Sequence, residues 1–178
     1  MAYHPPQRAI GAHVLSLSRW IRGTFHLPKL RGFEEHLARG RTFFSLTKVS
    51  LGPGASLDFL ALRASTAHVV VPDASERDLR VAAVAGGVPR DVTCYLEHLA
   101  VHGSVELLPG VRTSDFLAHQ QGFIPLRGCR LVPPLQGRVE PLPIVFVNAQ
   151  SIVAVAEDRG LAAEPDAEEA VKTPVPAT

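Results

Sequence analysis

Two stretches of the chain, IRGTFHL at Ile21–Leu27 and VHGSVEL at Val101–Leu107, share one pattern. In both, apolar and polar residues alternate around a glycine, Gly23 in the first and Gly103 in the second. A period of two residues is typical of a strand that buries one face. The two stretches therefore predict two equivalent strands, offset by 80 residues, and point to an internal repeat.

The repeat extends well beyond these strands. An offset of 80 residues aligns 7 identities in the 29 positions from Gly23 to Leu51. The identical pairs are Gly23/Gly103, Leu27/Leu107, Leu37/Leu117, Ala38/Ala118, Phe43/Phe123, Leu46/Leu126 and Leu51/Leu131. Further along, the offset becomes 85 and pairs Leu57 with Leu142. The additional residues of the second copy fall in VPPLQGRVEP, a turn-forming sequence where insertions are tolerated. This alignment predicts a tandem duplication.

Both copies predict the same elements in the same order. A short helix follows the first strand, at residues 32–39 and again at 114–121, where Thr113 or Ser114 can cap its start. Each copy then continues with a strand and a closing hairpin. The strands are expected at 42–51, 57–62 and 67–71 in the first copy, and at 122–132, 144–147 and 152–156 in the second.

The predicted fold class is mainly β, with a minor helical part. Each copy is a small β-barrel-like unit of four to five strands plus one short helix, near the lower size limit for an independent core. We therefore expect the two units to pack face to face around a pseudo-twofold axis. The expected segments are an N-terminal extension (1–14), a basic repeat (15–73), a packed connector (74–94), a second repeat (95–158) and a disordered acidic tail rich in Pro and Ala (159–178).

Composition excludes several classes of protein. The chain has 178 residues, of which 46% are hydrophobic and 20% charged, the ordinary balance of a soluble globular protein. It contains no apolar stretch long enough to span a membrane and no basic-then-apolar leader. Cys94 and Cys129 are too few for a disulfide framework, so we expect buried thiols in a reducing compartment, the cytoplasm.

Catalytic motifs are absent from the sequence. There is no serine in a Gly-x-Ser-x-Gly elbow, and Gly86 and Gly87 are not followed by the Lys and Ser or Thr of a phosphate-binding loop. The adjacent carboxylates of Glu34 and Glu35 would point in different directions on a helix. We expect no enzymatic activity, no cofactor and no small-molecule substrate.

Cys94, His98 and His102 form the most suggestive metal-binding pattern. Their spacing of four would place all three on one face of a helix or strand, where they could bind zinc. The set lacks a fourth ligand, and the repeat places Ser18 and Arg22 at the positions of the two histidines. We therefore favour ordinary core or surface histidines and predict no metal.

Basic residues gather in the first copy, which carries a net charge of +4 from Arg19 to Asp73. They could form a nucleic-acid-binding face, with Phe43 or Trp20 for stacking, or a docking site for an acidic protein. Arg31 and Arg112 each precede a predicted helix with an acid three residues on, which favours a local ion pair over a ligand contact. The candidate binding residues are Arg31, Arg39, Arg41, Arg112, Asp115 and Asn148.

The second copy, read as GSVELLPGVRTSDFL, GFIPLRGCRL and LPIVFVNAQSIVAVAED, resembles in outline the small β-barrels of the Sm-like class, which includes Hfq. In that class a strand, a turn carrying Asn or Gly, and a final strand close the barrel, as Val145–Val155 would with Asn148 in the turn. The chain departs from the class in its predicted helix at 114–121. The resemblance implies RNA binding by a ring-shaped oligomer. The composition is equally compatible with a bacterial family that has no assigned activity.

The function predicted from these observations is that of a scaffold or adaptor. Small strand-rich units with hydrophobic runs present sheet edges, which readily accept a strand from a partner or from another copy. We expect a protein partner or self-association, with no membrane contact. RNA binding by the basic face of the first copy is the alternative.

Overall fold

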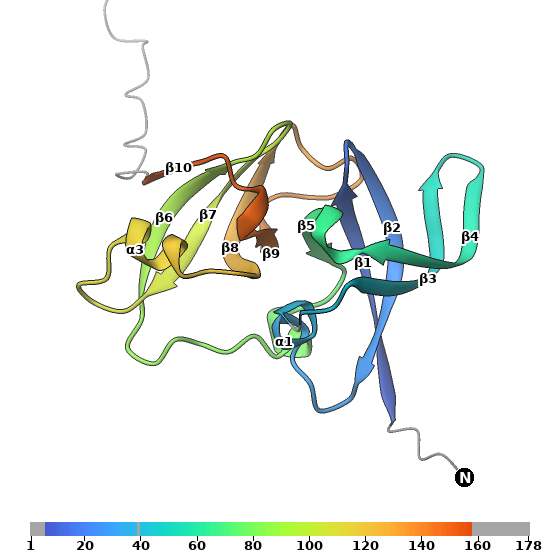
Figure 1. Ribbon diagram of the computed structural model, residues 1–178, viewed down its shortest axis with the longest axis horizontal. Coiled ribbons are helices and arrows are strands. Elements are labelled where there is room, and N and C mark those ends of the chain that lie inside the picture. The colour runs from blue at the N-terminus through green and yellow to red at the C-terminus, as the bar shows by residue number, and fades with distance from the viewer. Residues whose placement is uncertain (1–5, 39, 158–178) are drawn as a thin grey trace, which may run out of the picture.

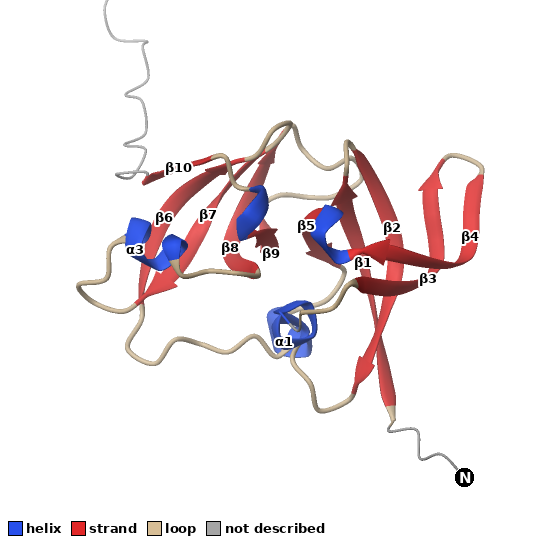
Figure 2. Ribbon diagram, in the orientation of Figure 1, coloured by secondary structure: helices blue, strands red, loops and turns tan. Residues whose placement is uncertain are grey.

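The computed structural model describes residues 6–38 and 40–157 and confirms a mainly β protein (Figures 1 and 2). The first half contains β1 (Gln7–Ser16), β2 (Arg19–Pro28), α1 (Phe33–Ala38), β3 (Phe43–Gly52), β4 (Ala55–Arg63), the 3-10 turn η1 (Ala64–Thr66) and β5 (Ala67–Pro72). The second half contains α2 (Glu76–Leu79), β6 (Val88–Tyr95), β7 (Ala100–Leu107), α3 (Thr113–Ala118), β8 (Phe123–Val132), β9 (Leu142–Asn148), η2 (Ala149–Ser151) and β10 (Ala154–Glu157). The tail predicted at 159–178 lies outside the described residues.

These strands form one antiparallel sheet in the order β10-β6-β7-β8-β9-β5-β1-β2-β3-β4. Within each half, the first strand pairs with both the second and the last: β1 with β2 and β5, and β6 with β7 and β10. The helices predicted after the first strand pattern are confirmed as α1 and α3. β5 and β9 join the two halves, so β4 and β10 lie at the two ends of the sheet (Figure 1).

The two glycines of the opening pattern lie at matching irregularities of the sheet. The β2–β3 register shifts beside Gly23, and the β7–β8 register shifts beside Gly103. The facing strands carry left-handed backbone there, with φ of 50° at Lys48 and 59° at Gly128. Such bulges bend a strand and increase its twist. A Cβ on Gly103 would lie 2.8 Å from the Cys129 sulfur, so the close approach of β8 requires glycine there.

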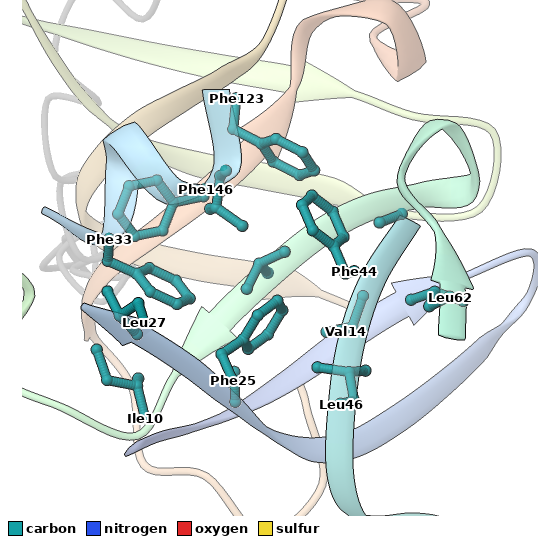
Figure 3. Close-up of a cluster of buried hydrophobic side chains, with 14 of the residues drawn as sticks. Ile10, Val14, Phe25, Leu27, Phe33, Phe44, Leu46, Leu62, Phe123 and Phe146 are labelled. Atoms are coloured by element: carbon teal, nitrogen blue, oxygen red, sulfur yellow. The ribbon is translucent and has the colours of Figure 1, made fainter. Parts of the chain in front are cut away.

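Buried side chains form two hydrophobic cores, one in each half. The first is rich in phenylalanine and contains Phe25, Phe33 and Phe44, with Phe123 and Phe146 contributed by the second half (Figure 3). The second is built mainly from aliphatic residues of β6–β9, and it also contains Val69 and Val71 of β5. Each core therefore depends on residues from the other half.

The closing hairpins expected from the sequence are wrong in both halves. Each copy was predicted to end in a hairpin, yet β4 pairs with β3 while β5 pairs with β1, and β10 pairs with β6. The 3-10 turns η1 and η2 carry the chain from one edge of each half to the other. Periodicity identifies a strand but does not name its partner, which is why the hairpins were mistaken.

The packing of the halves also differs from expectation. A pseudo-twofold arrangement would join like strands, but the junction pairs β5, the last strand of the first half, with β9, the fourth strand of the second. The packing is therefore head to tail. The predicted N-terminal extension contributes β1, whose Ala12 and Val14 are fully buried. The predicted connector provides α2 and most of β6. α3 begins at Thr113, and its N-cap residue is Arg112, which makes no side-chain cap hydrogen bond, rather than the expected Thr113 or Ser114.

The bulge at Gly103 yields a stability prediction. Gly103→Ala should lower the free energy of unfolding by ~1–3 kcal/mol, because the new methyl group overlaps the Cys129 sulfur and the Arg127 carbonyl oxygen at 3.1 Å. Gly122→Ala is the matched control, since its Cβ would meet Ala38 at an ordinary 3.7 Å. Urea denaturation followed by circular dichroism measures both. Equal stability of the two variants would contradict this account of the bulge.

Candidate interaction surfaces

The junction between the halves shows how this chain joins one sheet edge to another. β5 and β9 pair in the register Val69 with Val147 and Val70 with Phe146. Side chains of β9 alternate between the two cores: Phe146 enters the first and Val147 the second. The Asn148 side-chain amide donates a hydrogen bond to the carbonyl oxygen of Ala67, 3.0 Å away. Backbone pairing, apolar packing on both faces and a side-chain hydrogen bond all act together at this junction.

Aromatic rings carry much of the packing at the junction. Phe146 is completely buried and meets the ring of Phe33 edge-on at 5.4 Å, and Phe123 lies 6.0 Å from Phe44 (Figure 3). Phe33 belongs to α1, so this helix forms one wall of the recess that receives Phe146. Edge-to-face pairs of this kind stabilise a core beyond the area that they bury.

Polar contacts between Arg138 and the end of β5, called the Arg138 clamp, also connect the two halves. Arg138, in the loop between β8 and β9, bonds the carboxylate of Asp73 and donates to the carbonyl oxygen of Pro72 at 3.1 Å. Arg22 and His13 also lie 3.4 and 3.6 Å from that carboxylate. Arg138 lies in VPPLQGRVEP, the stretch where the sequence alignment predicts an insertion. That loop therefore ties the end of β5 to the second half.

His36, in α1, is the buried titratable group of this region. Its ring stacks on Phe33 at 6.5 Å and meets Phe25 edge-on at 6.0 Å. Burial, reinforced by the positive charges of Arg41 and Arg31, lowers the pKa of His36 to about 4. The imidazole is consequently neutral at physiological pH and behaves as part of the aromatic core.

The outer strand β4 exposes apolar side chains on an unpaired edge. Phe59 is 58% exposed, Phe43 of the neighbouring β3 is 47% exposed and Leu57 is 41% exposed. The guanidinium of Arg63 lies over the Phe43 ring, 5.6 Å from its centre. β4 pairs with β3 on one side only, which leaves a row of backbone donors and acceptors free on the other. This edge, with Phe43, Leu57 and Phe59, is called the β4 edge below.

At the opposite end of the sheet, a groove of about 720 Å³ runs between α3 and β10. Its apolar lining includes Leu117, Ile152 and Val155, and Arg112 and Glu157 supply charge. Val153 also lines this groove and is 76% exposed. β10 pairs with β6 alone. This surface is called the β10 groove below.

The candidate binding residues of the sequence do not form a single site. Arg31 makes an ion pair at 3.2 Å with Glu35, rather than with the expected Glu34. Arg41 and Asn148 line a second groove, of about 670 Å³, between the halves. Arg112 lines the β10 groove. Asp115 is exposed in α3 and makes no ion pair with Arg112, while Arg39 lies outside the described residues.

The candidate metal residues are not on one face of one element. Cys94 is buried in β6, His98 is exposed in the turn and His102 lies on β7, within 2.8 Å of Thr93. Thr93 and Cys94 point to opposite sides of β6, so His102 and Cys94 do as well. Among the described residues, no cluster of metal-ligating side chains is found. The burial predicted for Cys94 and Cys129 is confirmed.

Sequence reasoning found Arg112 but missed Phe59 and the apolar residues of the β10 groove. The repeat alignment pairs Phe59 with Ile144, which is only 2% exposed, but no pattern showed that one would be covered and the other open. Comparison with known families, curated proteins and solved structures finds no match to this chain. Within the described residues, no helix is long and apolar enough to cross a membrane.

The different surroundings of Phe146 and Phe59 can be measured. Phe146→Ala should cost ~3–5 kcal/mol of unfolding free energy, because it empties a packed aromatic site. Phe59→Ala should change that free energy by less than about 0.5 kcal/mol, since its ring is mostly exposed in the single chain. Thermal and urea denaturation at low protein concentration compare the two. A small loss for Phe146→Ala would show that the junction does not hold the halves together.

The buried imidazole of His36 should make stability depend on pH. Its folded pKa of about 4 is below the unfolded value of 6.5, so the unfolded chain binds the proton more tightly. Stability is therefore complete above pH 6.5 and falls as pH drops towards 4, by ~3 kcal/mol for this group.

His36→Phe provides the comparison, because the alignment places Phe116 at this position in the second half. The variant should lose less stability than the native chain between pH 6.5 and 4 in urea titrations. Parallel curves for the two proteins over this range would contradict the assignment.

Proposed function

We propose that this chain is a non-enzymatic assembly or adaptor protein, built from two homologous β-rich units, that binds other proteins through the open ends of its sheet. The observation that carries the proposal is the exposed apolar surface at the β4 edge, beside unpaired backbone groups. A strand edge flanked by exposed aromatic rings is suited to binding another strand. The β10 groove offers a second surface of this kind.

A tandem duplication of a small barrel-like unit accounts for the common plan of the halves. The strand order is the same in both, and the register irregularities fall at Gly23 and Gly103, which the alignment pairs. In each half the last strand returns to pair with the first, as expected of a sheet that closes towards a barrel. On this interpretation the protein carries two versions of one connecting surface.

The side-chain chemistry supports binding rather than catalysis. Burial raises the pKa of the Cys94 thiol to about 11 and of the Cys129 thiol to about 12, so both remain protonated and unreactive. The charged side chains of Arg22 and Arg138 both pair with the Asp73 carboxylate where the halves meet. Arg127 similarly joins Glu76 at 3.1 Å and Glu106 at 3.5 Å. These groups hold elements together.

Quantitative co-purification from cells that express the chain naturally tests the proposed function. Tagged native chain should retain protein, either untagged copies or another protein, and Phe59→Lys should reduce that protein at least about tenfold by placing a charge on the β4 edge. Val132→Lys is the matched control, since Val132 is exposed to 55% on the inner strand β8. Equal recovery with all three baits would overturn the proposal.

The same samples address the Sm-like alternative. The absorbance ratio at 260 and 280 nm reports bound RNA, which salt should release if phosphate contacts hold it. Nucleic acid recovered equally by native and Phe59→Lys protein, with no protein dependent on Phe59, would replace the adaptor function by RNA binding.

A further inference from the structure

We propose that the β4 edge of one copy pairs with the β10 groove of a second copy, in the register that β9 and β5 already form within the chain. The inference rests on the proposed function and names its partner. The junction pairs β5, the last strand of the first half, with β9, the fourth strand of the second half. Under the 85-residue offset, β9 corresponds to β4 and β5 corresponds to β10. The two end strands, β4 and β10, thus correspond to the two strands of the junction, but neither has a partner on its outer side.

The donor surface can be compared residue by residue. Ile144, Phe146 and Phe123 of the second half are 2%, 0% and 7% exposed, because they pack into the first half. Their counterparts in the first half are Phe59, Ala61 and Phe43. Phe59 and Phe43 are 58% and 47% exposed. These positions are therefore covered in the second half and open in the first half.

The acceptor surface shows the same relation. In the first half, Leu37 of α1 and Ala67 and Val70 of β5 belong to the same core as Phe146, and Val70 is its strand partner. Their counterparts are Leu117, Ile152 and Val155, and all three line the β10 groove. Under the alignment, the β10 groove therefore corresponds to the site that Phe146 occupies in the first half. α3 forms a wall of the groove as α1 forms a wall of the recess.

The register of the proposed contact follows from the junction. Val69 with Val147 and Val70 with Phe146 translate into Ala154 with Leu62 and Val155 with Ala61. The strand pairings inside the halves agree with this register. Val70 pairs with Val14 and Val155 pairs with Cys94, and Val14 and Cys94 are themselves aligned by the 80-residue offset. Each copy offers one donor and one acceptor at opposite ends of its sheet. The assembly is heterologous and continues until it closes into a ring or extends as a filament.

The contact between copies should be weaker than the junction inside the chain. Phe146 corresponds to Ala61, so a large ring is replaced by a methyl group. The loop that carries Arg138 corresponds to the short turn between β3 and β4, which has no such arginine. Because the contact between copies lacks counterparts of Arg138 and of the Phe146 ring, assembly should be reversible and depend on protein concentration.

Disulfide trapping tests the register. Ala61→Cys and Val155→Cys are combined in a Cys94→Val background, because Cys94 is the strand partner of Val155 and could capture the new thiol. Directly paired residues of antiparallel strands lie within disulfide reach. Mild oxidation of the purified full chain should produce a ladder of linked copies on non-reducing gels. Adding Phe59→Lys should reduce the linked fraction at least about tenfold.

Matched controls separate the alternatives. Asp58→Cys with Val155→Cys is displaced by three residues, roughly 10 Å along the strand, and should not link. Ala61→Cys in the same Cys94→Val background should also give no dimer. A dimer from this variant would show that β4 edges pair with each other and would overturn the head-to-tail contact. Light scattering of the native chain over a range of concentrations should show association that Phe59→Lys weakens.

The outcomes also separate this inference from the proposed function. A chain that stays monomeric and gives no ladder, yet loses a different co-purifying protein on Phe59→Lys, overturns self-assembly and leaves the adaptor function in place. A chain that neither links nor binds any protein through Phe59 overturns both.

Discussion

The pairing of β5 with β9 is the interaction on which the rest of the structure depends. It is formed by only two register pairs, yet it converts the strands of two halves into one sheet. Because the residues of both strands alternate between the two cores, each strand is buried on both faces. Neither half could retain its core unchanged without the other, since the first core would lose Phe146 and the second would lose Val69 and Val71.

A head-to-tail junction has a geometric consequence that a twofold junction lacks. When like surfaces meet, both are used and the association closes. When unlike strands meet, one unpaired strand edge remains at each end, here β4 and β10. The exposed rings of Phe59 and Phe43 are therefore a direct result of how the halves are joined, rather than an isolated feature of β4.

Sequence periodicity was sufficient for the elements but not for their connections. The alternation around Gly23 and Gly103 identified β2 and β7, and the 80-residue offset placed α1 and α3 correctly. The hairpins were wrong because an alternating pattern does not identify a strand's neighbours. A usable signal was present in the continuous apolar runs Val69–Val71 and Ile144–Val147, which are typical of strands buried on both faces. The candidate surfaces were missed because exposure depends on the final neighbour.

Differences between the halves are consistent with a contact between copies that is weaker than the junction inside the chain, as we propose above. The second half carries Phe146, Asn148 and the Arg138 loop, so its fourth strand combines aromatic packing, a buried hydrogen bond and an ionic clamp. The first half has Ala61, Arg63 and a tight turn at the same places. A covalently linked pair of units gains from a strong, permanent junction, because the two units meet at high effective concentration. The proposed contact with a separate molecule must instead open and close, and the β4 edge, which has Ala61 where the second half has Phe146, is suited to that role.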